Sequence, residues 1–178
     1  GHPVKKFGEQ QVSHLDYVKL LNDAMSLNSS EVDIRHKRNF PETQKKWEDA
    51  EAKVNGYEYG QSLDICGFQV MQSWEAPLMN AMARTASARG GVILEIGYGL
   101  GLCAKKVQSN RPEKHIIVEA NREVAERARK ELSQAINDGY VYIIESFWEE
   151  LAPLDLLREY APNGFDGIIF DTYPLKKD

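Results

Sequence analysis

From Gly90 onward, short apolar runs alternate with stretches of helical character, and this alternation limits the fold more than any other feature. The apolar runs are VILEIGYG (92–99), HIIVEA (115–120), YVYIIES (140–146) and FDGIIFD (165–171). Strands that alternate with helices are typical of a parallel sheet with helices on both faces. We therefore predict an α/β, doubly wound (Rossmann-like) fold, whose ligands bind beyond the carboxyl ends of the strands.

The alternation stops after the fourth predicted strand, which ends at Asp171. Open sheets of this kind normally continue for two or three further strands, and without them the last strand is an exposed apolar edge. We therefore expect the chain to be truncated after the fourth strand, as a part of a longer enzyme.

The first part of the chain has a different pattern. Apolar residues recur at helical spacing near the N-terminus, and residues 42–54 are charged on all sides except for Trp47, which predicts a solvated helix. We divide the chain into a helical N-terminal extension, residues 1–60, and a cofactor-binding domain, residues 61–178.

A further helix is predicted from Leu63 to Arg89, where apolar residues again follow a helical period. Pro77 has no amide proton, so it should bend or restart this helix. Glu75 stands two residues earlier in the stretch QSWEAPLM, among apolar neighbours. A carboxylate at such a junction is either an ordinary helix-start residue or half of a site.

Composition and charge exclude several classes of function. The chain has 178 residues and a formal charge of −5, and its Lys and Arg residues are scattered, so no basic patch for nucleic acid or a membrane surface is predicted. A small cationic substrate suits this charge better. Cys66 and Cys103 lack CxxC spacing, and no apolar run is long enough to span a bilayer. These features predict a soluble, reduced, cytoplasmic protein, and they are compatible with a homo-oligomer.

The turn EIGYGLG after the first strand places Gly97, Gly99 and Gly101 in a GxGxG pattern. Such a turn lets the backbone approach a ligand closely at a helix N-terminus, although Leu102 stands where the dinucleotide fingerprint has its third glycine. Glu119 closes the second strand, where an acid accepts ribose hydroxyls. A plain tight turn and a solvated strand end are the alternatives. These two features do not choose between a nicotinamide cofactor and S-adenosylmethionine.

The ends of the third and fourth strands are more specific. After the third strand, ESFWEE offers Ser146 and the flat apolar pair Phe147 and Trp148 to hold an adenine, with ordinary core packing as the alternative. The fourth strand ends in DTYP, residues 171–174, which resembles the turn that amino-group methyltransferases place beside the methyl donor.

The order of motifs resembles guanidinoacetate N-methyltransferase and its relatives that methylate arginine guanidinium groups. The motifs are VM-x-x-WE-x-P-x-M (70–79), LE-x-G-x-G (94–99), IIVEAN (116–121), FWEE (147–150) and FDGIIFDTYP (165–174). The resemblance covers residues from about 64 to 178, and the WE-x-P and DTYP elements are its most selective parts. It implies an N-methyltransferase that uses S-adenosylmethionine and a small guanidino substrate.

The resemblance also implies roles for individual residues. Glu75 and Asp171 bind the substrate guanidinium, with Asp171 as the catalytic base and Glu75 orienting the far side. Because a guanidinium is a planar fork of donors, two carboxylates can fix which nitrogen faces the methyl group. Without the family, Glu75 could equally interact with a helix dipole and Asp171 could form a turn. Thr172 is assigned to the substrate site.

Other residues complete the prediction. Tyr98, inside the glycine turn, and Met79 are assigned to the cofactor site, and no metal is expected because no His/Cys cluster has ligand spacing. The predicted reaction is methylation of guanidinoacetate to creatine. The alternatives are a free or peptidyl arginine methyltransferase, and a non-catalytic cofactor-binding or partner module if the last strands are missing.

Overall fold

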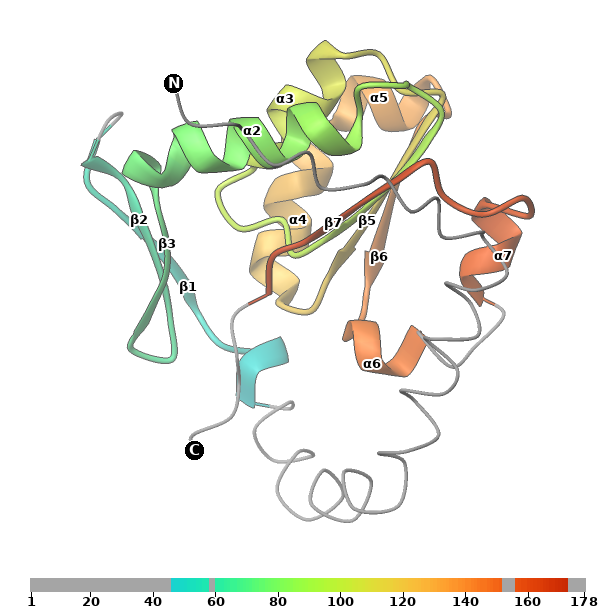
Figure 1. Cartoon of the computed structure of the whole chain (residues 1–178). Coiled ribbons are helices and arrows are strands. Elements are labelled where there is room, and N and C mark those ends of the chain that lie inside the picture. Colours follow the sequence, from blue (N-terminus) through green and yellow to red (C-terminus); the bar gives the residue numbers. More distant parts are fainter. Residues whose placement is uncertain (1–45, 58–59, 152–155, 173–178) are drawn as a thin grey trace, which may run out of the picture. The chain divides into compact units, whose positions relative to one another are not determined.

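A sheet of four parallel strands forms the centre of the structure, a computed structural model that describes residues 46–57, 60–151 and 156–172 (Figure 1). Its strand order is β6-β5-β4-β7. The strands are β4 (Val92–Ile96), β5 (Lys114–Glu119), β6 (Val141–Glu145) and β7 (Gly167–Phe170). These are the four strands predicted from the apolar runs, and their parallel pairing confirms the predicted fold class.

Both faces of this sheet are covered, which explains why its strands are nearly continuous apolar runs. Ile93, Ile117 and Ile169 pack in one core, together with residues of α2, α3 and α4. The opposite face packs in a second core with residues of α6 and α7. The helices are α2 (Ala76–Ala86), α3 (Leu102–Ser109), α4 (Arg122–Glu131), α5 (Ser133–Asn137), α6 (Trp148–Leu151) and α7 (Leu156–Tyr160).

A second, antiparallel sheet corrects the prediction for residues 63–72, which were expected to be helical. It consists of β1 (Ala52–Asn55), β2 (Ser62–Ile65) and β3 (Phe68–Gln72), in that order. The turn between β2 and β3 is Cys66-Gly67, and both residues have positive φ, 54° and 78°. A two-residue turn of this kind matches the twist of a β-hairpin. Leu63 and Ile65 alternate with polar neighbours and are buried, as in a strand with one covered face.

The helix predicted over residues 42–54 is also wrong in its second half. Residues 46–48 are helical, but residues 52–55 form β1. Trp47 is buried in the first core, so the surrounding segment is not a freely solvated helix. The chain divides into two units, Gly1–Glu42 and Thr43–Asp178, and all described residues belong to the second. The helices predicted before residue 46 lie outside the described residues, and the domain boundary at residue 60 stays a prediction.

The junction predicted at Pro77 is confirmed. The 3-10 helix η2 (Ser73–Glu75) leads directly into α2, with the proline in the first turn. A missing amide proton costs nothing there, because the first amides of a helix have no partner within the helix. Glu75 is therefore the residue at which one helical segment ends and the next begins.

β7 lies at one edge of the described part of the sheet. Among the described strands it pairs only with β4, and two of its side chains, Ile168 and Phe170, are more than half exposed. On its other face, α2 packs closely against it. In the described part of the chain, no helix combines the length and the apolar character needed to cross a bilayer.

The tight packing between α2 and β7 generates a prediction about stability. A Cβ atom on Gly167 would collide with the carbonyl oxygen of Ala86 at the end of α2. We expect Gly167→Ala to lower the free energy of unfolding by about 1–3 kcal/mol, as for an overpacked site, measured by urea denaturation. Gly60→Ala is the control, because a Cβ there meets no atom within 4 Å. Equal stability of the two variants would contradict the packing described.

Candidate active site

The carboxyl ends of the parallel strands bring the predicted site segments to one edge of the sheet. In the register of the sheet, Ile96 of β4 pairs with Val118 of β5 and with Phe170 of β7. The residues that follow, including Gly97 and Asp171, are therefore neighbours although they are far apart in sequence.

Gly97 and Asp171 touch through their backbones. Gly97 has φ +90° and donates its amide to the carbonyl of Val118 at 2.8 Å. A Cβ atom on Gly97 would collide with the carbonyl oxygen of Asp171. Only glycine satisfies both the positive φ and this approach. The glycine turn therefore lies directly against Asp171, the residue that follows β7.

Met71 lies on the glycine turn from the antiparallel sheet. Its sulfur accepts a hydrogen bond from the amide of Leu100 at 3.2 Å, and a Cβ on Gly99 would lie 2.6 Å from its methyl carbon. The sequence analysis gave Met71 no role, although it stands in the same motif as Glu75. With the hairpin of β2 and β3 unrecognised, nothing in the sequence indicated that Met71 reaches this turn.

Glu119 is buried at the end of β5 and holds two neighbouring segments. Its Oε2 accepts from the amide of Tyr98 at 2.9 Å, and its Oε1 accepts from the amide of Asn121 at 2.8 Å. Burial raises the pKa of Glu119, and the surrounding backbone amides oppose that shift. The amides of Gly99 and Ala120 also interact with this carboxylate, so four backbone donors surround it. The ribose contact itself stays a prediction.

The side chain of Tyr98 packs against the glycine turn and supports it. Its ring is buried, and its hydroxyl donates to Oε2 of Glu131 on α4 at 2.8 Å. Burial and the neighbouring Glu131 raise the pKa of Tyr98. The hydroxyl also lies beneath Gly101, where a Cβ would contact it. Tyr98 therefore stabilises the glycine turn, and a direct contact with the cofactor stays a prediction.

The predicted aromatic pair is divided between the two cores. Phe147 is buried in the first core, whereas Trp148 belongs to the second and packs edge-on against Phe170, with ring centroids 5.0 Å apart. This arrangement favours the core-packing alternative for both rings. Ser146 donates its amide to the carbonyl of Glu119 at 3.1 Å, which ties the end of β6 to that of β5. Contacts between these residues and adenine remain predictions.

Met79 and Thr172 occupy different surroundings. Met79 is buried in the first core, and its sulfur lies 3.7 Å from the sulfur of Cys103 on α3. Thr172 is partly buried and directly follows Asp171. Neither residue makes a further contact that decides its role, so both assignments stay predictions.

The charge of Glu75 acts on the carboxyl group of Asp171. Burial raises the pKa of Asp171, and the negative charge of Glu75 raises it further. Glu75 is partly buried, and its Oε1 accepts the amide of Gln72 at 2.8 Å, as in a capping box. One oxygen of Glu75 therefore has the role of an ordinary helix-start residue. The charge of this carboxylate also acts on Asp171, and a substrate-binding role for Glu75 stays a prediction.

The sequence analysis missed a buried pair beneath the site. Nε2 of His115 lies 2.8 Å from Oε2 of Glu95, and both side chains are buried. Gln108 contacts the other ring nitrogen of His115 at 2.7 Å. Burial raises the pKa of Glu95, His115 lowers it, and the charge of Asp171 raises it. Alternation of side chains along β4 and β5 was the available signal for the pairing of His115 with Glu95.

No group of three or more His, Cys, Asp or Glu side chains that could hold a metal ion occurs among the residues that the structure describes.

The fold and the site together define a Rossmann-like domain with a glycine turn and an acidic strand end, as in nucleotide-dependent transferases. A family model described as guanidinoacetate N-methyltransferase matches residues 37–178, so the chain belongs to that family. This membership confirms the resemblance seen in the motifs, and with it S-adenosylmethionine as the cofactor.

Individual relatives agree with the family. Protein arginine N-methyltransferase 2 of Candida glabrata is 33% identical over 113 residues, which are 58% of this chain and 25% of that protein. The protein of the same name from Saccharomyces cerevisiae is 29% identical over 109 residues, 58% of this chain and 26% of its own length. The chain spans about a quarter of the length of these curated relatives.

A solved structure supports the fold alone. Spermidine synthase from Thermotoga maritima superposes with a TM-score of 0.53 at 24% identity, over 71% of this chain and 45% of that chain.

The coupling between the two carboxylates generates a prediction about pKa. Because the like charge of Glu75 raises the pKa of Asp171, Glu75→Gln should lower that pKa, while burial keeps it above the usual value. The measurement is a pH titration of the Asp171 carboxyl carbon by NMR. Glu113→Gln is the matched control, since Glu113 precedes β5 at the opposite end of the sheet. An Asp171 pKa that does not respond to Glu75→Gln would contradict the described geometry.

Proposed function

We propose that this protein transfers a methyl group from S-adenosylmethionine to a guanidino nitrogen. The observation that carries the proposal is the pair of carboxylates, Glu75 and Asp171, which interact electrostatically at the edge of the sheet that carries the glycine turn. Two like charges held together are unfavourable by themselves, and a bound cation removes the repulsion. A guanidinium supplies that positive charge in a planar shape that carboxylates can grip from two sides.

The two carboxylates have different tasks. Glu75 has one oxygen engaged with the backbone of Gln72, so its position is fixed and its other oxygen remains for substrate. Asp171 adjoins Gly97, next to the expected position of the methyl donor. The attacking nitrogen must lose a proton, and Asp171 accepts it because its raised pKa makes it a stronger base than an ordinary aspartate. Glu75 orients the guanidinium and balances its charge.

The chain's residues also fit the cofactor. Gly97 and Gly99 have positive φ, which lets the turn lead tightly into α3, and the first amides of that helix have no partner within the helix and can bind a ligand. Glu119 ends β5, the position at which an acidic residue binds the ribose in folds of this kind, and this supports a role in cofactor binding. When bound, the cofactor supplies a methyl group on positively charged sulfur. The remaining contribution of the protein is to align nitrogen, carbon and sulfur, a proximity effect of up to about 7–11 kcal/mol.

Guanidinoacetate, which would give creatine, is the first candidate substrate, and the match to the family model supports it. A free or peptidyl arginine is the second candidate, and the relatives named protein arginine N-methyltransferase 2 support that one. Both substrates present the same guanidinium to Glu75 and Asp171. They differ only in the group attached to it, so the proposed chemistry is common to both.

Replacement of the base tests the proposal. We expect Asp171→Asn to lower kcat by about 100-fold or more, because it keeps shape and hydrogen bonding but cannot take the proton. Affinity for S-adenosylhomocysteine should change little. The measurements are single-turnover methylation of guanidinoacetate and of an arginine peptide, and calorimetry of S-adenosylhomocysteine binding.

Asp138→Asn is the matched control, because Asp138 is exposed and bonds only to the side chain of Gln134 among the hydrogen bonds described for it beyond the backbone. It should leave both measurements unchanged. An Asp171→Asn protein with near-normal turnover would remove the base from the mechanism, and an unmodified chain that does not bind S-adenosylhomocysteine would contradict the proposed function itself.

A further inference from the structure

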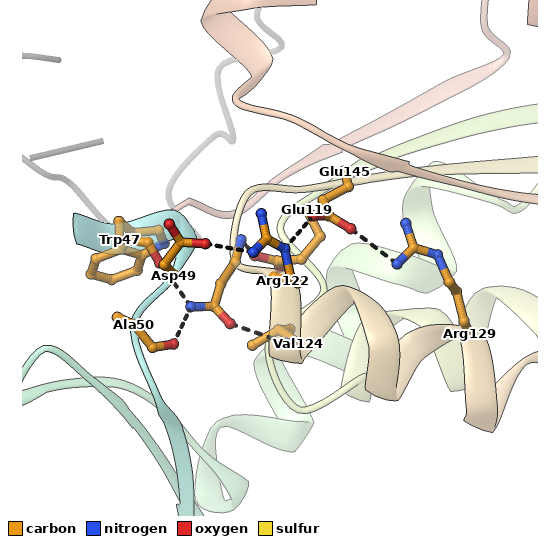
Figure 2. A network of polar contacts seen from close by, with 9 residues as sticks. Trp47, Asp49, Ala50, Glu119, Arg122, Val124, Arg129 and Glu145 are labelled. Carbon is orange, nitrogen blue, oxygen red and sulfur yellow. Dashed lines mark hydrogen bonds and ion pairs between the residues drawn. The ribbon is translucent and has the colours of Figure 1, made fainter. Parts of the chain in front are cut away.

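Three consecutive residues at the start of α4 hold the segment that precedes the antiparallel sheet. We call this segment, residues 46–52, the strap. Asn121 is fully buried, and its side-chain amide donates to the carbonyls of Trp47 and Ala50, both at 2.8 Å (Figure 2). Its oxygen accepts from the amide of Val124 at 3.1 Å and so caps α4. One side chain therefore binds the strap and begins the helix.

The next two residues bind the strap as well. Nη1 of Arg122 lies 2.7 Å from Oδ1 of Asp49, and Oε2 of Glu123 accepts from the amide of Ala52 at 2.8 Å. Arg122 is itself held from the other side, since its Nε lies 3.2 Å from Oε1 of Glu145. The second oxygen of Glu145 lies 3.0 Å from Nη1 of Arg129 (Figure 2). Asp49, Arg122, Glu145 and Arg129 thus form one alternating chain of charges.

This network lies beside Glu119, the residue to which the proposed function assigns the ribose. Glu119 accepts the backbone amide of Asn121, and Glu145 is the last residue of β6, opposite Glu119 in the register of the sheet. The strap is therefore attached at the ends of β5 and β6. Asp171, in contrast, follows β7, which lies on the other side of β4. The strap borders the nucleoside half of the site and lies away from the base.

The interactions that hold the strap are of two kinds. Asn121 is buried, so its hydrogen bonds are protected from water and costly to break. Asp49 and Arg122 are about half exposed, so their attraction is weak, reversible and screened by salt. The pair of Asp49 and Arg122 can therefore break while Asn121 and Glu123 still hold the strap, and the domain stays folded.

We propose that Arg122 is a positioning residue that, by pairing with Asp49, seats the strap against the nucleoside half of the cofactor site and slows cofactor release. This inference rests on the proposed function, because it names a residue that controls cofactor binding at the same site. Arg122 does not touch the reacting atoms, so its effect belongs to cofactor affinity and residence time. The rate of the methyl-transfer step does not depend on it.

The strap offers a matched pair of variants. Asp49→Asn and Glu51→Gln each remove one negative charge, but Glu51 pairs only with Lys53 among the ion pairs described for it and does not reach α4. We expect Asp49→Asn to raise both the Kd and the dissociation rate of S-adenosylhomocysteine about two- to fivefold, the range of a partly exposed ion pair. Glu51→Gln should leave both unchanged. The single-turnover rate at saturating cofactor should be equal in the two variants.

Two further measurements separate pairing from a general effect of charge. In 1 M salt the difference between Asp49→Asn and the unmodified chain should disappear, because the Debye length falls to about 3 Å. In a double-mutant cycle, Asp49→Asn should add nothing to the effect of Arg122→Gln. Additive effects, or equal affinities of Asp49→Asn and Glu51→Gln at low salt, would overturn the role of Arg122.

Amide hydrogen exchange of the full chain without cofactor distinguishes failure of this inference from failure of the proposed function. The amide of Ala52, which Glu123 binds, should exchange faster in Asp49→Asn than in Glu51→Gln. If it does and the unmodified chain does not bind S-adenosylhomocysteine, the strap is held as described but the proposed function fails. If S-adenosylhomocysteine binds equally to both variants and exchange at Ala52 is equal, the proposed function stands and the inference fails.

Discussion

The carboxylate of Glu119 is the interaction on which the arrangement of the site depends. It accepts the amide of Tyr98 in the glycine turn and the amide of Asn121 at the start of α4. The carbonyl of the same residue accepts the amide of Ser146 at the end of β6. One buried residue therefore joins three segments that are separate in sequence, and Asn121 extends the connection to the strap. Burial of this carboxyl is unfavourable, and the backbone donors offset that cost.

Glu95 and His115 place a second polar pair under the same edge. Burial of polar groups is costly unless they are paired, and Glu95 and His115 lie 2.8 Å apart within the sheet. Glu95 also feels the charge of Asp171. The pair therefore lies in electrostatic contact with the proposed base, whereas the apolar residues of the same strands serve packing.

The parallel sheet, and the edge at which its strands end near the glycine turn, were predictable because each is marked by a short, continuous sequence pattern. Each strand is a continuous apolar run, and the glycine turn directly follows one of them, so strand ends and site residues could be placed together. Family motifs pointed to Glu75 and Asp171, and the charge of Glu75 raises the pKa of Asp171, while their roles in substrate binding stay predictions. The junction at Pro77 followed from the missing amide proton alone.

The antiparallel sheet was missed because its strands are only four or five residues long and their apolar residues also fit a helical period. The turn Cys66-Gly67 lacks the Asn or Asp that usually marks a two-residue hairpin. Because the hairpin was not predicted, the contact of Met71 with the glycine turn could not be predicted either. The helix predicted over residues 42–54 likewise gave no indication of the strap. Long-range contacts such as Arg122 with Asp49 have no local signal, since they depend on the position of a segment that the sequence had placed elsewhere.

The central claim is that Glu75 and Asp171 recognise the positive charge of a guanidinium. Its most direct test is calorimetry of guanidinoacetate and of ureidoacetate, in which an uncharged urea replaces the guanidinium, each in the presence of S-adenosylhomocysteine. Because a buried charge-assisted contact contributes about 1.5–3 kcal/mol, two of them predict at least about 100-fold weaker binding of the urea analogue. Equal affinity for the two compounds would contradict the account, because binding to the two carboxylates would then not depend on the positive charge of the ligand.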